Sequence, residues 1–144
     1  MNITKKTYQE ICTFFQKRHV TEEGGLLGSS TGKVIDCFFP DYQASIKTKN
    51  SYTPNIFYLN QQLQEWEKNE ITFCGIIHSH LTNTPKLSDA DIRYIEKIMK
   101  AMPNSIKQLY FPLIVQPKTQ FISYKAVRNL WNKVNIQSDS IKII

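Results

Sequence analysis

The chain has 144 residues, of which 41% are hydrophobic and 21% are charged. This size and composition are typical of one globular domain that buries a core without disulfide or metal support. No apolar run approaches the length needed to cross a bilayer, and the N-terminal residues MNITKKTYQE lack the apolar stretch of a signal peptide. We therefore expect a single domain over residues 1–144 that works in the cytoplasm and has no membrane partner.

The net charge of +6 comes mostly from lysines spread along the chain. Nucleic-acid binding usually requires a basic cluster with aromatic residues among it, and Lys47-Thr48-Lys49 is a thin candidate. We expect a solvated surface instead, and no nucleic acid among the partners.

The cysteines, Cys12, Cys37 and Cys74, are odd in number, scattered and set among apolar neighbours. This predicts reduced thiols in the core rather than a disulfide framework. Strand alternation places Cys74 on the same face as His78 and His80, but about 13 Å from His78 at the rise of a strand. We therefore exclude Cys74 as a ligand of the same metal ion.

Apolar periodicity predicts the elements of the first half in chain order. The spacing of Tyr8, Ile11, Cys12 and Phe15 predicts a helix over residues 4–18. The segments that follow are predicted as a hairpin of 24–28 with 34–39, ended by Pro40, a mobile polar loop at 42–54, a short strand at 55–59 and a short polar helix at 61–69.

The second half begins with a predicted strand at 71–80. Phe73, Gly75 and Ile77 would face one way, and Cys74, Ile76, His78 and His80 the other. Both faces are apolar up to the histidines, which indicates a central strand covered on both sides.

The remaining segments are predicted as a helix from Ser88, strands at 110–115 and 120–125, a last helix around 127–134, and a return to the sheet at 141–144. Helices and strands alternate irregularly. We therefore expect an α+β fold, a three-layer sandwich of a mixed, curved sheet between helices.

The segment HSHLTNTPKLSDAD, residues 78–91, carries the clearest chemical pattern. His78 and His80 project from one face of a strand, with their Cα atoms about 6–7 Å apart, which suits two ligands of one ion. The alternative is a pair of surface histidines at a strand end. With Asp91 as a third ligand, the set leaves a fourth tetrahedral position to water, as in hydrolytic zinc enzymes.

Ser88 and Asp91 also form a capping-box pattern, which many helices use for stability alone. Asp91, however, continues the apolar stripe of its helix towards Ile95 and Met99, so its carboxylate leans towards the core. A buried carboxylate without a partner is costly, and a cation would remove that cost. Asp89 is turned away and is expected to be a solvated acid of the first turn.

A zinc hydrolase also needs a proton acceptor beside its water. Glu22 and Glu23 lie directly before Gly24-Gly25, at the start of the first hairpin strand. Adjacent residues of an extended segment face opposite sides, so one of the two can point at the metal. The residues alone leave the choice open.

The combination of Glu-x-Gly-Gly, His-x-His, seven residues and Ser-x-x-Asp resembles the JAMM (MPN+) metalloproteases, and above all the compact prokaryotic JAB-domain proteins. The resemblance covers essentially the whole chain and implies the cytidine-deaminase-like JAB/MPN architecture. It implies that His78, His80 and Asp91 bind one Zn²⁺ per chain. It further implies that Glu22 is the general base and that Ser88 donates a hydrogen bond to the oxyanion.

The resemblance implies hydrolysis of a peptide or isopeptide bond after the C-terminal tail of a ubiquitin-like protein, in the manner of a deubiquitinase. Such a protein would be the partner, and a bacterial ubiquitin-like conjugation or antiphage system is one setting that the resemblance suggests. The loop at 42–54 and the segment 81–87 are candidates for the tail-binding groove. The alternatives are a peptidase for sulfur-carrier proteins, a non-haem iron oxygenase and a catalytically silent scaffold. The sequence leaves the oligomeric state open.

Overall fold

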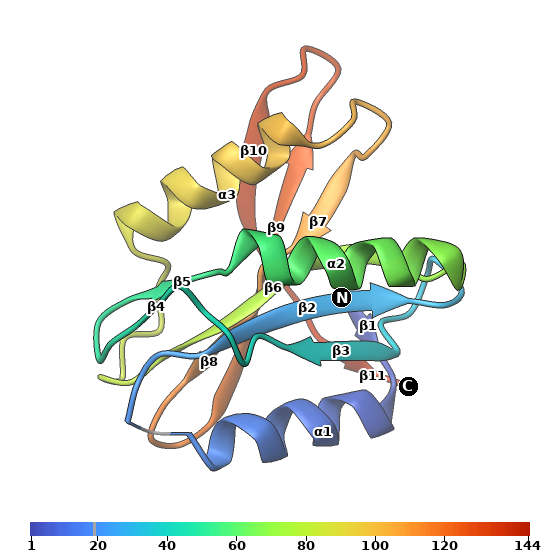
Figure 1. Cartoon of the computed structure of the whole chain (residues 1–144). Helices are drawn as coiled ribbons and strands as arrows, with labels where there is room; N and C mark the ends of the chain where they lie inside the picture. The colour runs from blue at the N-terminus through green and yellow to red at the C-terminus, as the bar shows by residue number, and fades with distance from the viewer. Residues whose placement is uncertain (19) are drawn as a thin grey trace.

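The computed structural model describes residues 1–18 and 20–144 (Figure 1). Its helices are α1 (Lys5–Gln16), α2 (Ile56–Lys68) and α3 (Asp89–Ala101). The main sheet contains, in spatial order, β10 (Val134–Asp139), β9 (Gln120–Arg128), β7 (Gln108–Tyr110), β6 (Thr72–His80), β2 (Gly24–Ser29) and β3 (Cys37–Pro40). A further short strand, β8 (Leu113–Val115), also lies between β6 and β9.

The sheet is mixed at its central strand. β6 runs antiparallel to β2 and parallel to both β7 and β8. Two small ladders lie outside the main sheet: β1 (Asn2–Ile3) with β11 (Lys142–Ile143), and β4 (Ile46–Lys47) with β5 (Tyr52–Thr53).

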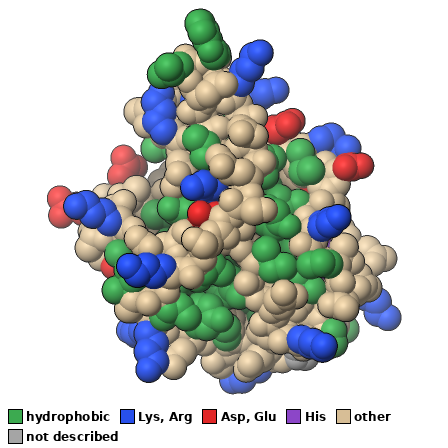
Figure 2. Space-filling model, turned by 180° about the vertical axis from the view of Figure 1, so that it is seen from behind, with side chains coloured by type: hydrophobic (Ala, Val, Ile, Leu, Met, Phe, Trp, Pro, Cys, Tyr) green, Lys and Arg blue, Asp and Glu red, His purple; other side chains and the backbone are tan. Residues whose placement is uncertain are grey.

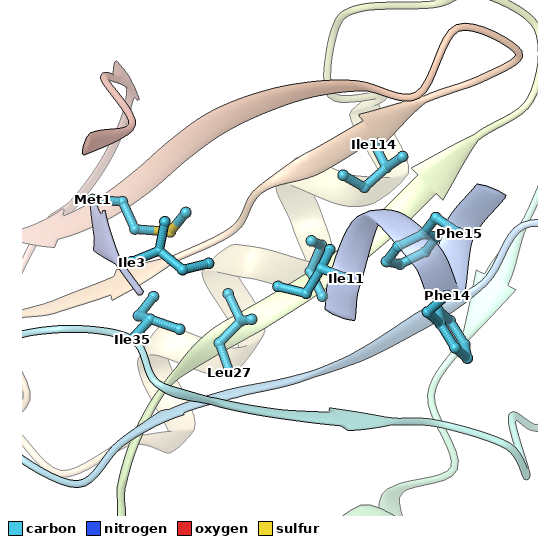
Figure 3. Packing of buried hydrophobic residues seen from close by; sticks show 9 residues of the cluster. Met1, Ile3, Ile11, Phe14, Phe15, Leu27, Ile35 and Ile114 are labelled. Atoms are coloured by element: carbon cyan, nitrogen blue, oxygen red, sulfur yellow. The ribbon is translucent and has the colours of Figure 1, made fainter. Parts of the chain in front are cut away.

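Two apolar clusters cover the two faces of the sheet and define three layers. On one face, Ile11 and Phe15 of α1 pack in one cluster with Leu27 (Figure 3), and Ile77 of β6 belongs to the same cluster. On the other face, α2 and α3 contribute a second cluster of buried residues, which includes Leu59, Trp66, Ile95 and Met99 as well as Leu26 and Ile76 of the sheet. Figure 1 shows α1 on the opposite side of the sheet from α2 and α3. The predicted three-layer fold with a mixed sheet is therefore confirmed.

The first helix, the first hairpin and the central strand lie where the sequence predicts them, with small shifts at their ends. Thr4 caps α1 by accepting a hydrogen bond from the backbone of Thr7. β2 and β3 form the predicted antiparallel pair. Within the described residues, no helix combines the length and apolar character required to cross a membrane.

The short strand predicted at 55–59 is wrong, because this segment opens α2. Asn55 caps the helix by accepting a hydrogen bond from the Tyr58 amide. Leu59, Leu63 and Trp66 then recur at helical spacing, and all of them pack into the second cluster. The strand propensity of these five residues was outweighed by the helical period of the longer segment.

The helix predicted around 127–134 is also wrong. β9 continues to Arg128, a turn follows, and β10 begins at Val134. The Asn129 side chain accepts hydrogen bonds from the amides of Trp131 and Lys133, which closes the turn. The helical spacing of apolar residues is misleading here because Leu130 and Trp131 are 98% and 82% exposed at the hairpin tip. Figure 2 shows apolar side chains at this outermost point of the molecule.

Two smaller predictions need correction. Ile141–Ile144 does not return to the main sheet, because β11 pairs with β1. Cys74 does not share the face of the histidines, because a bulge interrupts the pairing of β6 with β2. Cys74 packs against the α1 cluster, while Phe73 packs with Ile76 against the other. The extra residue of a bulge reverses the alternation on one side of it.

The cysteines at positions 12, 37 and 74 are free, as predicted, but each is half-buried rather than enclosed in the core. Burial raises the pKa of both the Cys37 and the Cys74 thiol to about 11. These thiols therefore stay protonated near neutral pH.

Gly75 offers a test of how closely β6 and β7 approach each other. Its φ is +152°, and a Cβ atom there would lie 1.8 Å from the Tyr110 carbonyl oxygen. We expect Gly75→Ala to lower the free energy of unfolding by at least about 3 kcal/mol in urea denaturation. Gly32→Ala is the matched control, because Gly32 has a φ of +75° and no atom within 4 Å of the added Cβ. It should cost about 1 kcal/mol, and equal losses in both variants would contradict the close approach.

Candidate metal centre

The C-terminal end of β6 carries both histidines to one face of the sheet. His78 pairs with Gly24 of β2 on one side and with Leu113 of β8 on the other. The central position of the strand leaves little freedom to its backbone. His80 is buried, and the His78 side chain is 12% exposed.

The start of α3 brings Asp91 to these histidines. The His78 and His80 Nε2 atoms lie 3.1 Å apart. Asp91 Oδ1 lies 3.3 Å from His78 Nε2, and Asp91 Oδ2 lies 3.1 Å from His80 Nε2. Zinc bonds of about 2.0–2.1 Å in a tetrahedral site imply ligand atoms about 3.3 Å apart. Each Asp91 oxygen faces one histidine, and one donor atom from each residue lies within 4.8 Å of the other two, so the donor set fits a zinc ion held by His78, His80 and Asp91.

Secondary contacts orient the candidate ligands. The Nδ1–H of His80 donates to the Thr84 carbonyl at 3.1 Å, which leaves Nε2 to face the cluster. Asp91 Oδ2 accepts from the Ser88 amide at 2.8 Å, while the Asp91 amide donates to Ser88 Oγ at 3.1 Å. The predicted capping box is thus present, and the same carboxylate faces the histidines.

The electrostatics of the cluster favour a charged carboxylate. Burial alone would raise the pKa of Asp91, but hydrogen bonds from His78 and His80 hold it well below its usual range. Burial would lower the pKa of His80, but the Asp91 hydrogen bond and the Thr84 carbonyl raise it above its ordinary value. A metal cation could replace the protons that the histidines share with Asp91 and bind the same nitrogen and oxygen atoms.

The structure separates the two candidate bases. Glu22 is 7% exposed and lines the same cleft as the histidines. Burial raises the pKa of Glu22, although His80 and His78 oppose the shift. Glu23 points elsewhere and forms an ion pair with Lys47, with Nζ and Oε1 3.1 Å apart. The alternation expected of adjacent residues is therefore present, and Glu22 is the member of the pair beside the candidate ligands.

Glu22 and the three candidate ligands line a cleft of about 360 Å³. Its lining includes residues 50–54 from the β4–β5 hairpin, Ser88 as the N-cap of α3, and Tyr94 and Ile95 of that helix. Thr82 and Thr84 line it as well. Parts of both segments that the sequence suggests for a groove, 42–54 and 81–87, therefore contribute to the cleft. The first of them contains an antiparallel ladder that its polar sequence did not predict.

Other residues of the cleft wall were missed by the sequence analysis. Tyr52 donates a hydrogen bond to the fully buried Asp41 at 2.8 Å, which anchors strand β5 of the hairpin. The Tyr94 hydroxyl is buried without a hydrogen-bond partner among the described residues, and burial raises its pKa to about 12. The helical spacing of Tyr94 to Asp91 could have indicated its face, whereas Asp41 and Tyr52 become neighbours only in the folded chain.

Comparisons with known proteins support the fold. No family model and no curated protein matches the chain. A protein from Desulfitobacterium hafniense, known from its solution structure, matches with a TM-score of 0.68, 17% identity and coverage of 99% of this chain and 93% of its own. A JAB1/MPN domain protein from Archaeoglobus fulgidus matches with a TM-score of 0.55, 15% identity and coverage of 100% and 97%.

A third structure, described as a JAMM metalloprotease-like zinc site in the proteasome and signalosome, matches with a TM-score of 0.53 and 15% identity. The match covers 100% of this chain and 97% of the other. At these identities the likeness establishes a JAB/MPN-type fold. The His78-His80-Asp91 cluster adds a group with the composition expected of a metal site.

The metal centre can be tested by zinc titration against a competing chelator. We expect one zinc ion per chain, and we expect Asp91→Asn to weaken zinc binding more than about 100-fold because it removes the negative ligand. Asp89→Asn is the matched control, since Asp89 is an exposed acid of the same first helical turn. It should leave zinc affinity unchanged. Stoichiometric iron without zinc in the purified protein would point to an oxygenase-type site instead.

Proposed function

We propose that the chain is a zinc-dependent peptidase or isopeptidase that cleaves after the C-terminal tail of a ubiquitin-like protein. The observation that carries this proposal is the shared cleft of His78, His80 and Asp91 with Glu22 on a JAB/MPN-type fold. His78, His80 and Asp91 would hold the metal. A bound zinc ion would lower the pKa of a water molecule towards neutrality and polarise the substrate carbonyl.

Glu22 is the proposed general base. Its carboxyl is buried beside the candidate ligands, and its raised pKa moves it towards the operating pH, which favours proton transfer in both directions. Glu22 accepts the proton of the attacking water and later delivers it to the leaving amine. This order of reaction steps needs no covalent acyl-enzyme, so the free cysteines have no required role in it.

Ser88 is the proposed oxyanion donor. Its Oγ accepts a hydrogen bond from the Asp91 amide, so the hydroxyl proton remains available to donate into the cleft. A donor fixed by a helix terminus requires little reorganisation as charge develops on the carbonyl oxygen.

An extended, uncharged peptide segment suits the cleft. Between the hairpin and α3 the described lining carries acidic groups only at Glu22 and Asp91, and no lysine or arginine. The walls combine apolar residues such as Ile76 and Phe111 with threonines and serines. This composition supports a neutral, extended tail as the substrate rather than an acidic one.

The proposal is tested with a panel of ubiquitin-like fusions that differ in tail sequence and in linear or isopeptide linkage. We expect Glu22→Gln to retain zinc and to lose kcat by at least about 10³-fold on any tail that the wild type cuts, because the proton acceptor is gone. A Glu22→Gln enzyme with normal turnover would contradict this mechanism. Cleavage restricted to sulfur-carrier tails would redirect the substrate assignment without changing the chemistry.

The role of Ser88 can be separated from its capping role by two substitutions. Ala removes the hydroxyl and costs about 1 kcal/mol of helix stability, whereas Gly removes the hydroxyl and costs only a few tenths. We expect both variants to lose kcat by about 10²-fold, measured on the same fusion substrate at saturating zinc. If Ser88→Gly were nearly as active as the wild type, Ser88 would serve the helix and not the reaction.

A further inference from the structure

Glu23 is a buried acid that the proposed chemistry does not use. Its side chain is 6% exposed, and its carboxylate oxygen Oε1 lies 3.1 Å from Lys47 Nζ and 3.3 Å from the Thr21 hydroxyl. Burying a charge at this depth is costly unless it is paired. Lys47 belongs to the short strand β4, so this ion pair connects the start of β2 to the β4–β5 hairpin.

The backbone around Glu23 is held from both sides. The Glu23 amide donates to Ser79 Oγ at 3.0 Å, and the Ser79 amide donates to the Glu23 carbonyl at 2.9 Å. Ser79 lies between the two histidines of the candidate metal centre. On the other side, the Glu22 amide donates to the Thr48 carbonyl at 2.7 Å. The two adjacent acids are therefore held on opposite sides, Glu23 by its backbone hydrogen bonds to β6 and the proposed base, Glu22, by its hydrogen bond to the hairpin.

The hairpin itself has few other means of staying in place. β4 and β5 each contain two residues, and residues 45–51 are exposed. Tyr52 of β5 donates a hydrogen bond to Asp41, and Tyr52 packs against Gly24 so closely that a Cβ atom there would lie 2.3 Å from the Tyr52 ring. Lys47 lies opposite Tyr52 in the ladder, and the β4 side of the hairpin is joined to the residues before β2 by the Lys47–Glu23 pair and the adjacent Thr48–Glu22 hydrogen bond.

We propose that Glu23 and Lys47 form a latch that holds the β4–β5 hairpin against the start of β2 and thereby positions Glu22. The ion pair holds the position of Lys47 and so of the adjacent Thr48, whose carbonyl oxygen accepts a hydrogen bond from the Glu22 amide. Glu23 and Lys47 are thus positioning residues that act through Glu22. Their effect on turnover rests on the proposed function, whereas their effect on the hairpin does not.

The latch is tested with Lys47→Met, which removes the charge but keeps an unbranched apolar side chain, and with Lys47→Arg, which keeps the charge. Lys68→Met is the matched control, because Lys68 pairs with Glu65 on α2 at 3.3 Å and both are exposed. We expect Lys47→Met to lower kcat about tenfold, since small displacements of a catalytic group reduce turnover steeply. KM and zinc affinity should change less than about twofold. Lys47→Arg should restore most of kcat, and Lys68→Met should match the wild type.

Hydrogen–deuterium exchange of the zinc-loaded protein gives a second measurement that needs no activity. We expect amides of residues 46–53 and of Glu22 to exchange at least about tenfold faster in Lys47→Met than in Lys68→Met. Unchanged exchange would overturn the latch, and faster exchange with unchanged kcat would overturn its positioning role. A wild type that cleaves no tail would contradict the proposed function alone, and the exchange at Glu22 would then decide the latch.

Discussion

The pairing of β2 with β6 is the interaction on which the site depends. Register places Gly24 opposite His78, so the residue pair that precedes β2 comes directly beside the histidines. The hydrogen bonds between Glu23 and Ser79 continue this ladder past the last paired residue. A shift of one residue would exchange the faces of Glu22 and Glu23 and present the Lys47-paired acid to the metal centre.

The same atoms at the start of α3 stabilise the helix and contribute to the candidate metal centre. Asp91 closes a capping box with Ser88 and also faces both histidines. The partial positive charge of a helix N-terminus stabilises the ionised carboxylate that a metal requires. Packing of Ile95 and Met99 against the sheet fixes the distance of this terminus from β6. Stability and ligand geometry are therefore coupled, and a change that loosens α3 would also move a candidate ligand.

The β4–β5 hairpin adds a third element to a site that otherwise belongs to β6, β2 and α3. Its polar sequence gives it little apolar area with which to bind the domain, so two buried carboxylates hold it in place of an apolar core. Asp41 accepts a hydrogen bond from Tyr52, and Glu23 pairs with Lys47, which lies opposite Tyr52 in the β4–β5 ladder. Paired buried charges are sensitive to geometry, because loss of one partner leaves the other uncompensated. A hairpin held in this way is better suited to keeping one fixed conformation than to adapting its conformation to a substrate.

The sequence by itself determined the chemistry: His78, His80 and Asp91 as a candidate ligand set, Ser88 as a cap beside it, and the three-layer fold. These follow from local periods, since strand alternation and helical spacing fix which neighbouring side chains share a face. Long segments were predicted well for that reason, whereas short ones at 55–59 and 127–134 were not, because a few apolar residues fit several periods. The residues alone left the choice between Glu22 and Glu23 open and the family resemblance implied Glu22, but which of the two acids lines the cleft was decided by the tertiary structure. Their directions depend on the register with Ser79 and on the ion pair with Lys47, contacts between residues far apart in the chain.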